Sequence, residues 1–321
     1  MRIAVTGSIA TDHLMTFPGR FADQFIADKL DKVSLSFLVT GLEIRRGGVA
    51  ANIAFGLGCL GLEPLLVGSV GSDFGDYQRW LEDHGVNTSM VRRSSQFHTA
   101  RFVCTTDADL NQIASFYPGA MSEDASLDLS GLHGVADLVL IGAGDPAAML
   151  SLTKQCSANQ IPFAADTSQQ VAVLSGDQIQ ELVTGAAYLF SNEYEASLTE
   201  HKTGWSAAEV ISRVGVRVTT LGANGTRVDR SGEPPVLVGP VKDVHPADPT
   251  GTGDAFRAGF LAGVAWGLGL ERCAELGNLL AVQALETTGP QDYLLKPADL
   301  LARCASSYGQ DAADELGKHV N

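Results

Sequence analysis

The sequence predicts an α/β fold with a mainly parallel central sheet, helices on both faces of that sheet, and a small antiparallel β lid. Three observations carry this prediction. Short, continuously apolar runs recur along the 321 residues, as in strands that are buried on both faces. Helix-like stretches alternate with those runs, as in β-α-β units. Two segments, about 13–46 and 97–118, instead alternate polar and apolar residues, which is typical of a half-exposed antiparallel sheet.

The first strand is expected at 3–7, and a stretch of small and apolar residues at 47–60 is expected to form a helix packed closely on the sheet. The other buried strands are predicted at 65–70, 138–141, 163–166, 188–191 and 216–221. A helix is predicted over 77–84, and the tail from Leu294 is expected to be helical. We predict one domain over residues 1–321, with the two alternating segments inserted as the lid.

Residues 56–61 match the dinucleotide fingerprint G-x-G-x-x-G, but their context argues against that function. The fingerprint has to follow a strand and open a helix. Here it follows an apolar stretch of small residues and precedes a strand, so we expect it to close a helix. This argues against a nicotinamide enzyme. The P-loop pattern G-x-x-x-x-G-K-[ST] does not occur in the sequence.

Composition and charge restrict the partners that the chain can have. A net charge of −15 argues against nonspecific nucleic-acid binding, which needs a basic surface. Five cysteines without metal-ligand spacing fit reduced thiols in a cytoplasm. The chain starts almost directly with a strand, and no apolar run reaches the ~18 residues of a membrane span. We therefore expect a cytoplasmic enzyme with no nucleic-acid or membrane partner.

The most informative run is 248–254, Asp-Pro-Thr-Gly-Thr-Gly-Asp, which leads into an Ala-rich stretch expected to be helical. Backbone N–H groups at the start of such a helix, at Gly251, Thr252 and Gly253, favour an anion in front of them. Asp254, at or next to the helix start, can accept a proton. An anion cradle beside a base suits the transfer of a charged group onto a hydroxyl.

This run resembles the second signature of the ribokinase-like (PfkB-type) carbohydrate and nucleoside kinases, with Pro249 and Thr252 in place of the usual Thr and Ala. Residues 47–54, Gly-Gly-Val-Ala-Ala-Asn-Ile-Ala, resemble the first signature of that family. Residues 192–195 match its Asn-x-x-Glu element. The three elements stand in the order and spacing of the family. The resemblance implies a ribokinase-like fold and phosphoryl transfer from ATP with Mg²⁺.

In phosphoryl transfer, the protein mainly positions the reactants and stabilises charge. Asp254 is the expected base, and the amides of 251–254 are expected to hold the transferring phosphoryl group. By resemblance, Asn192 contacts the nucleotide and Glu195 organises Mg²⁺ through water, although this pair also fits a helix capping box.

The loop after the strand at 216–221 resembles the nucleotide-binding loop of the family. Its expected ATP contacts are Thr220, Gly222, Asn224 and Gly225. The Asn-Gly pair in this loop fits a plain hairpin turn equally well. Asp248 lies where many members of the family bind a monovalent cation, so K⁺ dependence is a hypothesis.

A separate set of residues is expected to bind the substrate that accepts the phosphoryl group. By resemblance, the sugar is held by Ser8, Asp12, Ser36, Gly47, Gly48 and Asn52, with Gln169 and Gln170 near a purine. Asp12 could instead cap a turn. Phe102 and Phe116 fall on predicted lid strands, where their rings could stack on a purine or only fill the contact between lid and body.

Runs at 6–14, 34–39 and 113–123 are similar to the adenosine kinases of mycobacteria and related actinobacteria. We therefore expect ATP-dependent phosphorylation of adenosine at its 5′-hydroxyl, which gives AMP and ADP and serves purine salvage. The alternative is a sugar kinase of the ribokinase or fructokinase type. A homodimer through the lid is also expected, because an exposed sheet with apolar residues seeks a partner.

Overall fold

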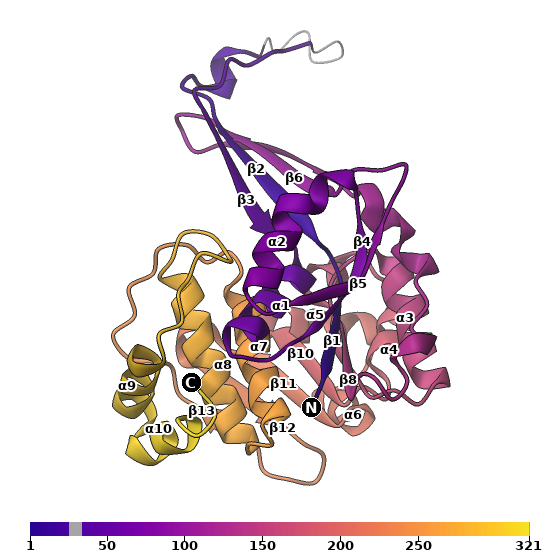
Figure 1. Ribbon diagram of the computed structural model, residues 1–321, viewed down its shortest axis with the longest axis vertical. Coiled ribbons are helices and arrows are strands. Elements are labelled where there is room, and N and C mark those ends of the chain that lie inside the picture. The colour runs from indigo at the N-terminus through magenta and orange to yellow at the C-terminus, as the bar shows by residue number, and fades with distance from the viewer. Residues whose placement is uncertain (26–33, 321) are drawn as a thin grey trace.

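The computed structural model describes residues 1–25 and 34–320 and has two sheets of different character (Figure 1). The strands of the large sheet are β1 (Ile3–Thr6), β4 (Leu65–Val70), β5 (Asn87–Arg93), β8 (Leu138–Ile141), β9 (Phe163–Asp166), β10 (Tyr188–Asn192), β11 (Val216–Thr220), β12 (Thr226–Asp229) and β13 (Val236–Val238). Their order is β13-β12-β11-β10-β9-β8-β1-β4-β5. From β5 to β11 neighbouring strands run parallel, and β12 and β13 add an antiparallel edge. The predicted mainly parallel sheet is confirmed.

Helices cover both faces of this sheet because its strands are apolar on both sides. In β1, Ile3 and Val5 enter one hydrophobic cluster and Ala4 enters the other. The first cluster contains α1 (Val49–Cys59), α2 (Gly75–Asp83), α7 (Thr252–Ala265), α8 (Leu270–Leu285), α9 (Pro297–Tyr308) and α10 (Gln310–Leu316). The second contains α3 (Pro146–Ala158), α4 (Gly176–Val183), α5 (Glu193–Thr203) and α6 (Ala207–Arg213). The helical tail expected from Leu294 is present as α9 and α10.

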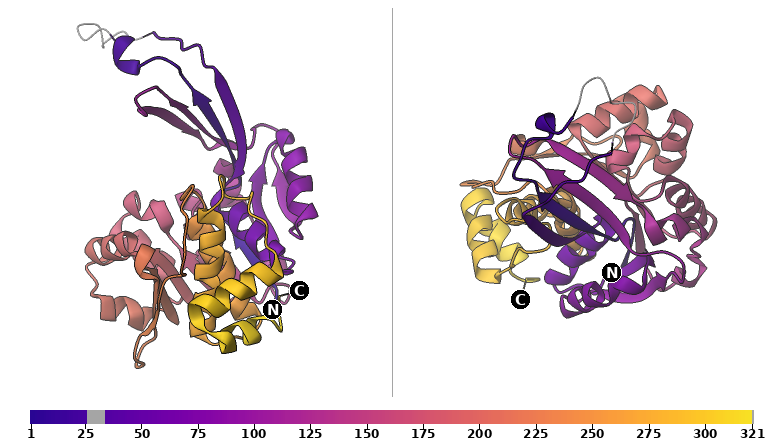
Figure 2. Two further views of the ribbon diagram at one scale, coloured as in Figure 1. Left: turned by 90° about the vertical axis from the view of Figure 1, so that its left-hand side faces the viewer. Right: turned by 90° about the horizontal axis from the view of Figure 1, so that it is seen from above.

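The lid is a smaller sheet of β2 (Ala10–Thr16), β3 (Gly41–Gly47), β6 (Ala100–Thr106) and β7 (Gln112–Tyr117), in the order β3-β2-β6-β7. Its outer pairs are antiparallel, and β2 and β6 run parallel at its centre. Figure 2 shows the lid projecting from the α/β body. Residues 26–33 of the expected lid segment lie outside the described residues. That residues 1–321 form one domain stays a prediction.

Two smaller expectations concern local segments. Residues 56–61 lie at the end of α1, which finishes at Cys59, so the apparent dinucleotide fingerprint closes a helix as expected. Within the described residues, no helix is both long enough and apolar enough to cross a membrane.

Candidate active site

A tight turn presents the N-terminus of α7 to an open cavity. Gly251 has φ of 75°, and a Cβ there would lie 2.4 Å from the Cβ of Pro290, so only glycine fits this turn without strain. The first N–H groups of α7 have no partner within the helix and point toward the cavity in front of it. The predicted anion cradle therefore has the backbone geometry that it requires.

The cavity measures about 360 Å³ and lies beyond the carboxyl ends of β9, β10 and β11, where open α/β sheets bind ligands. Eleven residues around it come from the motifs or their close neighbours: Ser168, Gln169, Asn192, Glu195, Thr220, Gly222, Gly225, Gly251, Thr252, Gly253 and Asp254. Phe256, Arg257, Asn278 and Ala281 complete the lining. The fold thus brings the expected catalytic and ATP-binding residues together, with the exception of Asn224, which is not in the lining.

Asp254 lies in the first turn of α7 and faces this cavity. Burial raises the pKa of its carboxyl to about 6, although the positive charge of Arg257 and a hydrogen bond from Asn52 both oppose that rise. A carboxylate with a pKa close to the working pH is well suited to accept a proton and release it again.

Arg257 and Asp166 form a buried ion pair below the cavity that the sequence analysis missed. Arg257 Nε lies 2.6 Å from Asp166 Oδ2, and Nη2 donates to Asp166 Oδ1 over 2.7 Å. Asp166 is fully buried and Arg257 is 6% exposed. The Nη1 edge lies close to Gly253, where a Cβ would be 2.8 Å away. The signal was available, because a single arginine inside an apolar helix needs a partner of opposite charge.

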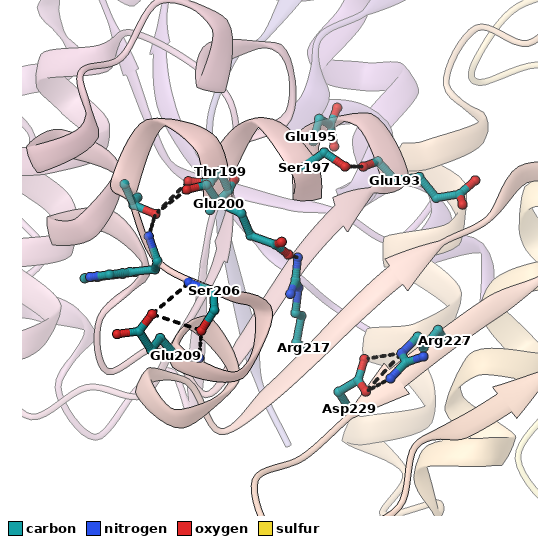
Figure 3. Close-up of polar contacts among 12 residues, drawn as sticks. Glu193, Glu195, Ser197, Thr199, Glu200, Ser206, Glu209, Arg217, Arg227 and Asp229 are labelled. Atoms are coloured by element: carbon teal, nitrogen blue, oxygen red, sulfur yellow. Dashed lines mark hydrogen bonds and ion pairs between the residues drawn. The ribbon is translucent and has the colours of Figure 1, made fainter.

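The start of α5 carries Asn192 and Glu195 to the rim of the same cavity. The two form a capping box, since Asn192 N donates to Glu195 Oε2 and Glu195 N donates to Asn192 Oδ1, both over 2.8 Å. Lower on the helix, Glu200 accepts from Arg217 Nη2 of β11 over 2.6 Å, and this ion pair anchors α5 to the sheet (Figure 3). Asn192 and Glu195 therefore form the capping box that their spacing allowed, and both still line the cavity.

The role of Glu195 as a magnesium ligand that acts through water stays a prediction. Burial raises the pKa of its carboxyl and so disfavours the ionised form, whereas the positive charge of a nearby cation would act in the opposite direction. The described residues contain no cluster of three or more acidic, histidine or cysteine side chains that could hold a metal by themselves. Mg²⁺ in kinases is usually held by one or two carboxylates together with the substrate phosphates, which this site can accommodate.

The loop after β11 is a hairpin, as the Asn-Gly pair allowed, because β12 pairs antiparallel with β11. Its Thr220, Gly222 and Gly225 still line the cavity. Thr226 donates to Asn278 Oδ1 over 2.7 Å and so ties the hairpin to α8. Asn278 itself reaches the cavity, and nothing in the sequence analysis had singled it out.

A second group of residues lies beside the cavity where the lid joins the body. Ser8 Oγ accepts from Val49 N over 2.9 Å, which fixes the start of α1. Gly48 has φ of 96°, and a Cβ there would lie 2.5 Å from the Ser8 carbonyl oxygen. From α1, Asn52 Nδ2 donates to Asp254 Oδ2 over 2.8 Å. The expected acceptor residues on the body therefore adjoin the expected base.

The lid contributes a row of side chains that share one face. Asp12 pairs with Arg45 on one side and Phe102 on the other, and Phe102 pairs with Phe116. Asp12 lies against Gly47, since its Oδ2 is 3.0 Å from where a Cβ of Gly47 would be. Burial raises the pKa of the Asp12 carboxyl, whereas Arg45 lowers it. An acidic group and two aromatic rings thus line one face of the lid.

The remaining expected residues have different surroundings. Gln169 lines the cavity, whereas Gln170 Nε2 donates to the Gly144 carbonyl over 2.6 Å and supports the chain there. Ser36 is exposed and precedes the outer end of β3, next to Phe37, whose ring packs on Phe17 with centroids 5.0 Å apart. The structure does not bring Ser36 to the other acceptor residues.

Asp248 is held at the base of the lid by three groups. Its carboxylate accepts from Thr250 N over 2.9 Å and from Gly289 N over 3.2 Å, and Arg45 Nη1 lies 3.0 Å away. Burial tends to raise the pKa of this carboxyl, but these partners together lower it. Monovalent-cation binding beside Asp248, which is already paired with Arg45, stays a prediction.

Residues 9–297 match the pfkB family carbohydrate kinases. The chain belongs to this family. The ribokinase-like fold expected from the three signatures is confirmed by solved structures of that fold, which include ribokinases with TM-scores of 0.72 to 0.78.

Similar pfkB family proteins include nucleoside kinases and a ribokinase. Burkholderia thailandensis nucleoside kinase, solved in complex with inosine, is 31% identical with a TM-score of 0.80, over 96% of this chain and 98% of that one. The nucleoside kinase of Methanocaldococcus jannaschii is 28% identical over 91% of this chain and 93% of that protein. Bacillus subtilis ribokinase is 28% identical over 90% and 94%, respectively. The finer similarity to mycobacterial adenosine kinases stays a prediction.

Proposed function

We propose that this pfkB family protein is a nucleoside kinase that transfers the γ-phosphoryl group of ATP to the 5′-hydroxyl of adenosine. The observation that carries the proposal is the Asn52–Asp254 hydrogen bond, which joins the acceptor residues of the body to the base at the anion cradle. A hydroxyl placed between Asn52 and Gly253 would meet both the proton acceptor and the amides that receive charge.

In the proposed mechanism, Asp254 takes the proton of the attacking 5′-hydroxyl as the bond to phosphorus forms. The N–H groups of 251–254 hold the phosphoryl oxygens as charge spreads over them. Glu195 and Asn192 would hold Mg²⁺, which when bound would neutralise part of the phosphate charge. Thr220, Gly222 and Gly225 would contact the nucleotide from the hairpin loop. ADP leaves from this side of the cavity, and AMP from the lid side.

The choice of a nucleoside rests on the aromatic lid face. Phe102 and Phe116 lie in one row with Asp12, so a ribose held by the carboxylate would place its base near the rings. Each base–aromatic stack contributes about 1–3 kcal/mol. A bare sugar has no such surface. The similarity to Bacillus subtilis ribokinase keeps ribose or fructose as the second candidate acceptor.

A coupled ADP-release assay tests the proposal, with Mg-ATP against adenosine, inosine, guanosine, ribose and fructose, each with and without K⁺. We expect turnover at low micromolar adenosine and little with the bare sugars. Phe102→Ala and Phe116→Ala should raise the KM for adenosine severely. A preference for ribose that these variants leave intact would instead establish the sugar-kinase alternative.

We also propose that the protein is a cytoplasmic homodimer that pairs through the outer face of the lid. Leu42 and Ile44 are each 59% exposed and Ile113 is 44% exposed. They share the face opposite to Asp12, as their strand pairing requires. Light scattering of the purified protein should give twice the chain mass. Ile44→Glu should reduce that mass to one chain if this face forms the interface.

A further inference from the structure

Asp254 lies at one end of a buried chain of side-chain hydrogen bonds that the proposed mechanism leaves unexplained. Asn52 Nδ2 donates to Asp254, and Gln291 Nε2 donates to Asn52 Oδ1, both over 2.8 Å. The same nitrogen of Gln291 donates to the Tyr77 hydroxyl over 2.6 Å. That hydroxyl donates to the carbonyl oxygen of Gly47 over 2.8 Å. The chain therefore runs from the expected base to the last residue of lid strand β3.

The Gly47 carbonyl fixes the direction of every bond in this chain. A carbonyl oxygen can only accept, so the Tyr77 hydroxyl gives its proton to it and is left to accept a bond from Gln291. The NH₂ group of Gln291 has two protons, and the second goes to Asn52 Oδ1. Asn52 then has its own NH₂ group directed at Asp254. The single NH₂ group of Gln291 therefore donates to both of its neighbours, the Tyr77 hydroxyl and Asn52 Oδ1.

We propose that Gln291 is a positioning residue for phosphoryl transfer, which holds the Asn52 amide with its N–H toward Asp254 and so keeps the base oriented for the acceptor hydroxyl. This inference rests on the proposed role of Asp254. Gln291 touches neither reactant and acts through Asn52. Within the described residues, Asp254 Oδ2 receives the Asn52 bond and Oδ1 has no hydrogen-bond partner, so Oδ1 is left for the hydroxyl.

The burial of Gln291 supports this role. The residue is 2% exposed, and its Oε1 has no hydrogen-bond partner among the described residues. A buried carbonyl without a partner destabilises the folded protein. Gln291 keeps its carbonyl unpaired and uses both N–H groups of its amide as donors. This indicates that the two donated hydrogen bonds are the function of the side chain.

Asn52 acts on Asp254 among several charged and titratable groups. Arg257 from α7 favours the ionised carboxylate, whereas Asp166 at the end of β9 and Glu195 from α5 disfavour it. Burial raises the pKa of the Tyr293 hydroxyl, beyond α8, and the negative charge of Asp254 adds to that rise. The acid limb of the pH–rate profile reports the sum of these influences, so a change confined to Gln291 can be measured against a constant background.

The decisive variant is Gln291→Glu, which keeps the shape of the side chain but replaces the hydrogen-bond donor with an acceptor. A carboxylate cannot donate to Asn52 Oδ1, so Asn52 has to turn its NH₂ group toward residue 291 and its carbonyl toward Asp254. We expect the acid limb of kcat/KM to move up by about one pH unit, which would lower the ionised fraction of Asp254 at pH 7, and kcat with it, by about twofold. The KM for adenosine should change less than kcat. Gln291→Met removes both donors without reversing them, and it should produce a smaller shift.

Gln180→Glu is the matched control. The side chain of Gln180 in α4 also donates a partly buried hydrogen bond, to the Thr203 carbonyl over 2.9 Å, but it does not line the cavity. The acid limb of this variant should equal that of the unmodified protein. If Gln291→Glu does not fold, Tyr77→Phe is the second variant. It should move the acid limb of kcat/KM up by a few tenths of a pH unit. Unchanged limbs in folded Gln291→Met and Tyr77→Phe would overturn the inference. Substantial turnover by Asp254→Asn would instead overturn the proposed mechanism.

Discussion

The pKa of Asp254 leads to a quantitative prediction for the pH dependence of catalysis. Burial raises this pKa to about 6 from the ordinary 3.8, so the carboxyl becomes neutral as the pH falls through 6. The ionised fraction is about 91% at pH 7 and about 9% at pH 5, which makes kcat/KM fall about tenfold between them. With a pKa of 3.8 the carboxylate would still be about 94% ionised at pH 5, and the rate would hardly change.

The assay is coupled ADP release at saturating Mg-ATP, with adenosine varied from pH 4.5 to pH 8. The γ-phosphate of ATP also titrates, with a second pKa near 6 for phosphate groups, so the profile is repeated at several Mg²⁺ concentrations. A limb due to Asp254 stays in place as Mg²⁺ changes. Circular dichroism at each pH confirms that the protein remains folded. A rate that stays constant down to pH 5 would contradict the assignment of Asp254 as a base with a raised pKa.

Three further predictions concern single sites. Asp254→Asn should lower kcat by several orders of magnitude while adenosine still binds, as measured by rapid-quench turnover and calorimetry, and near-normal turnover would remove its role. Arg257→Met should lower the free energy of unfolding in urea by about 3–5 kcal/mol, because Asp166 is left buried without its partner; Arg257→Gln combined with Asp166→Asn should recover much of that loss. Burial raises the pKa of Asp124 to about 7, so the folded protein keeps this proton between pH 4 and 7 whereas the unfolded chain loses it, and stability falls as the pH rises. Asp124→Asn should therefore raise Tm by a few degrees at pH 8 and by less at pH 5, and an equal change at both would refute this.

Much of the central sheet could be predicted because its parallel strands are continuously apolar. The runs at 65–70 and 138–141 are entirely buried strands. The strands β5, β12 and β13 were not anticipated. β5 and β13 are the edge strands, β12 lies next to β13, and their exposed faces carry polar residues such as Asn87 and Arg227. Periodicity reports burial, so it is weakest where a strand is half covered.

The candidate site divides in the same way. Motif spacing located Asp254 and the turn before α7, because backbone geometry there depends on local glycines. Gln291 and Asp166 could not be found by spacing, since their roles arise from contacts with residues far away in the chain. Ser36 was expected from resemblance alone, and it lies next to Phe37 at the outer end of the lid. Contacts between residues that are far apart in the sequence become visible only in the folded structure.

The position of β1 in the sheet has a consequence for how the chain is made. β1 leaves the ribosome before β4 and β8, yet it lies between them in the sheet, with Ala4 opposite Leu65 and Val139. One edge of β1 thus stays unpaired until the chain has been synthesised as far as Ile141. Such distant pairing is slow to form, and unpaired apolar edges favour aggregation. Nascent chains that stall before Ile141 should therefore be the species that depend most on chaperones.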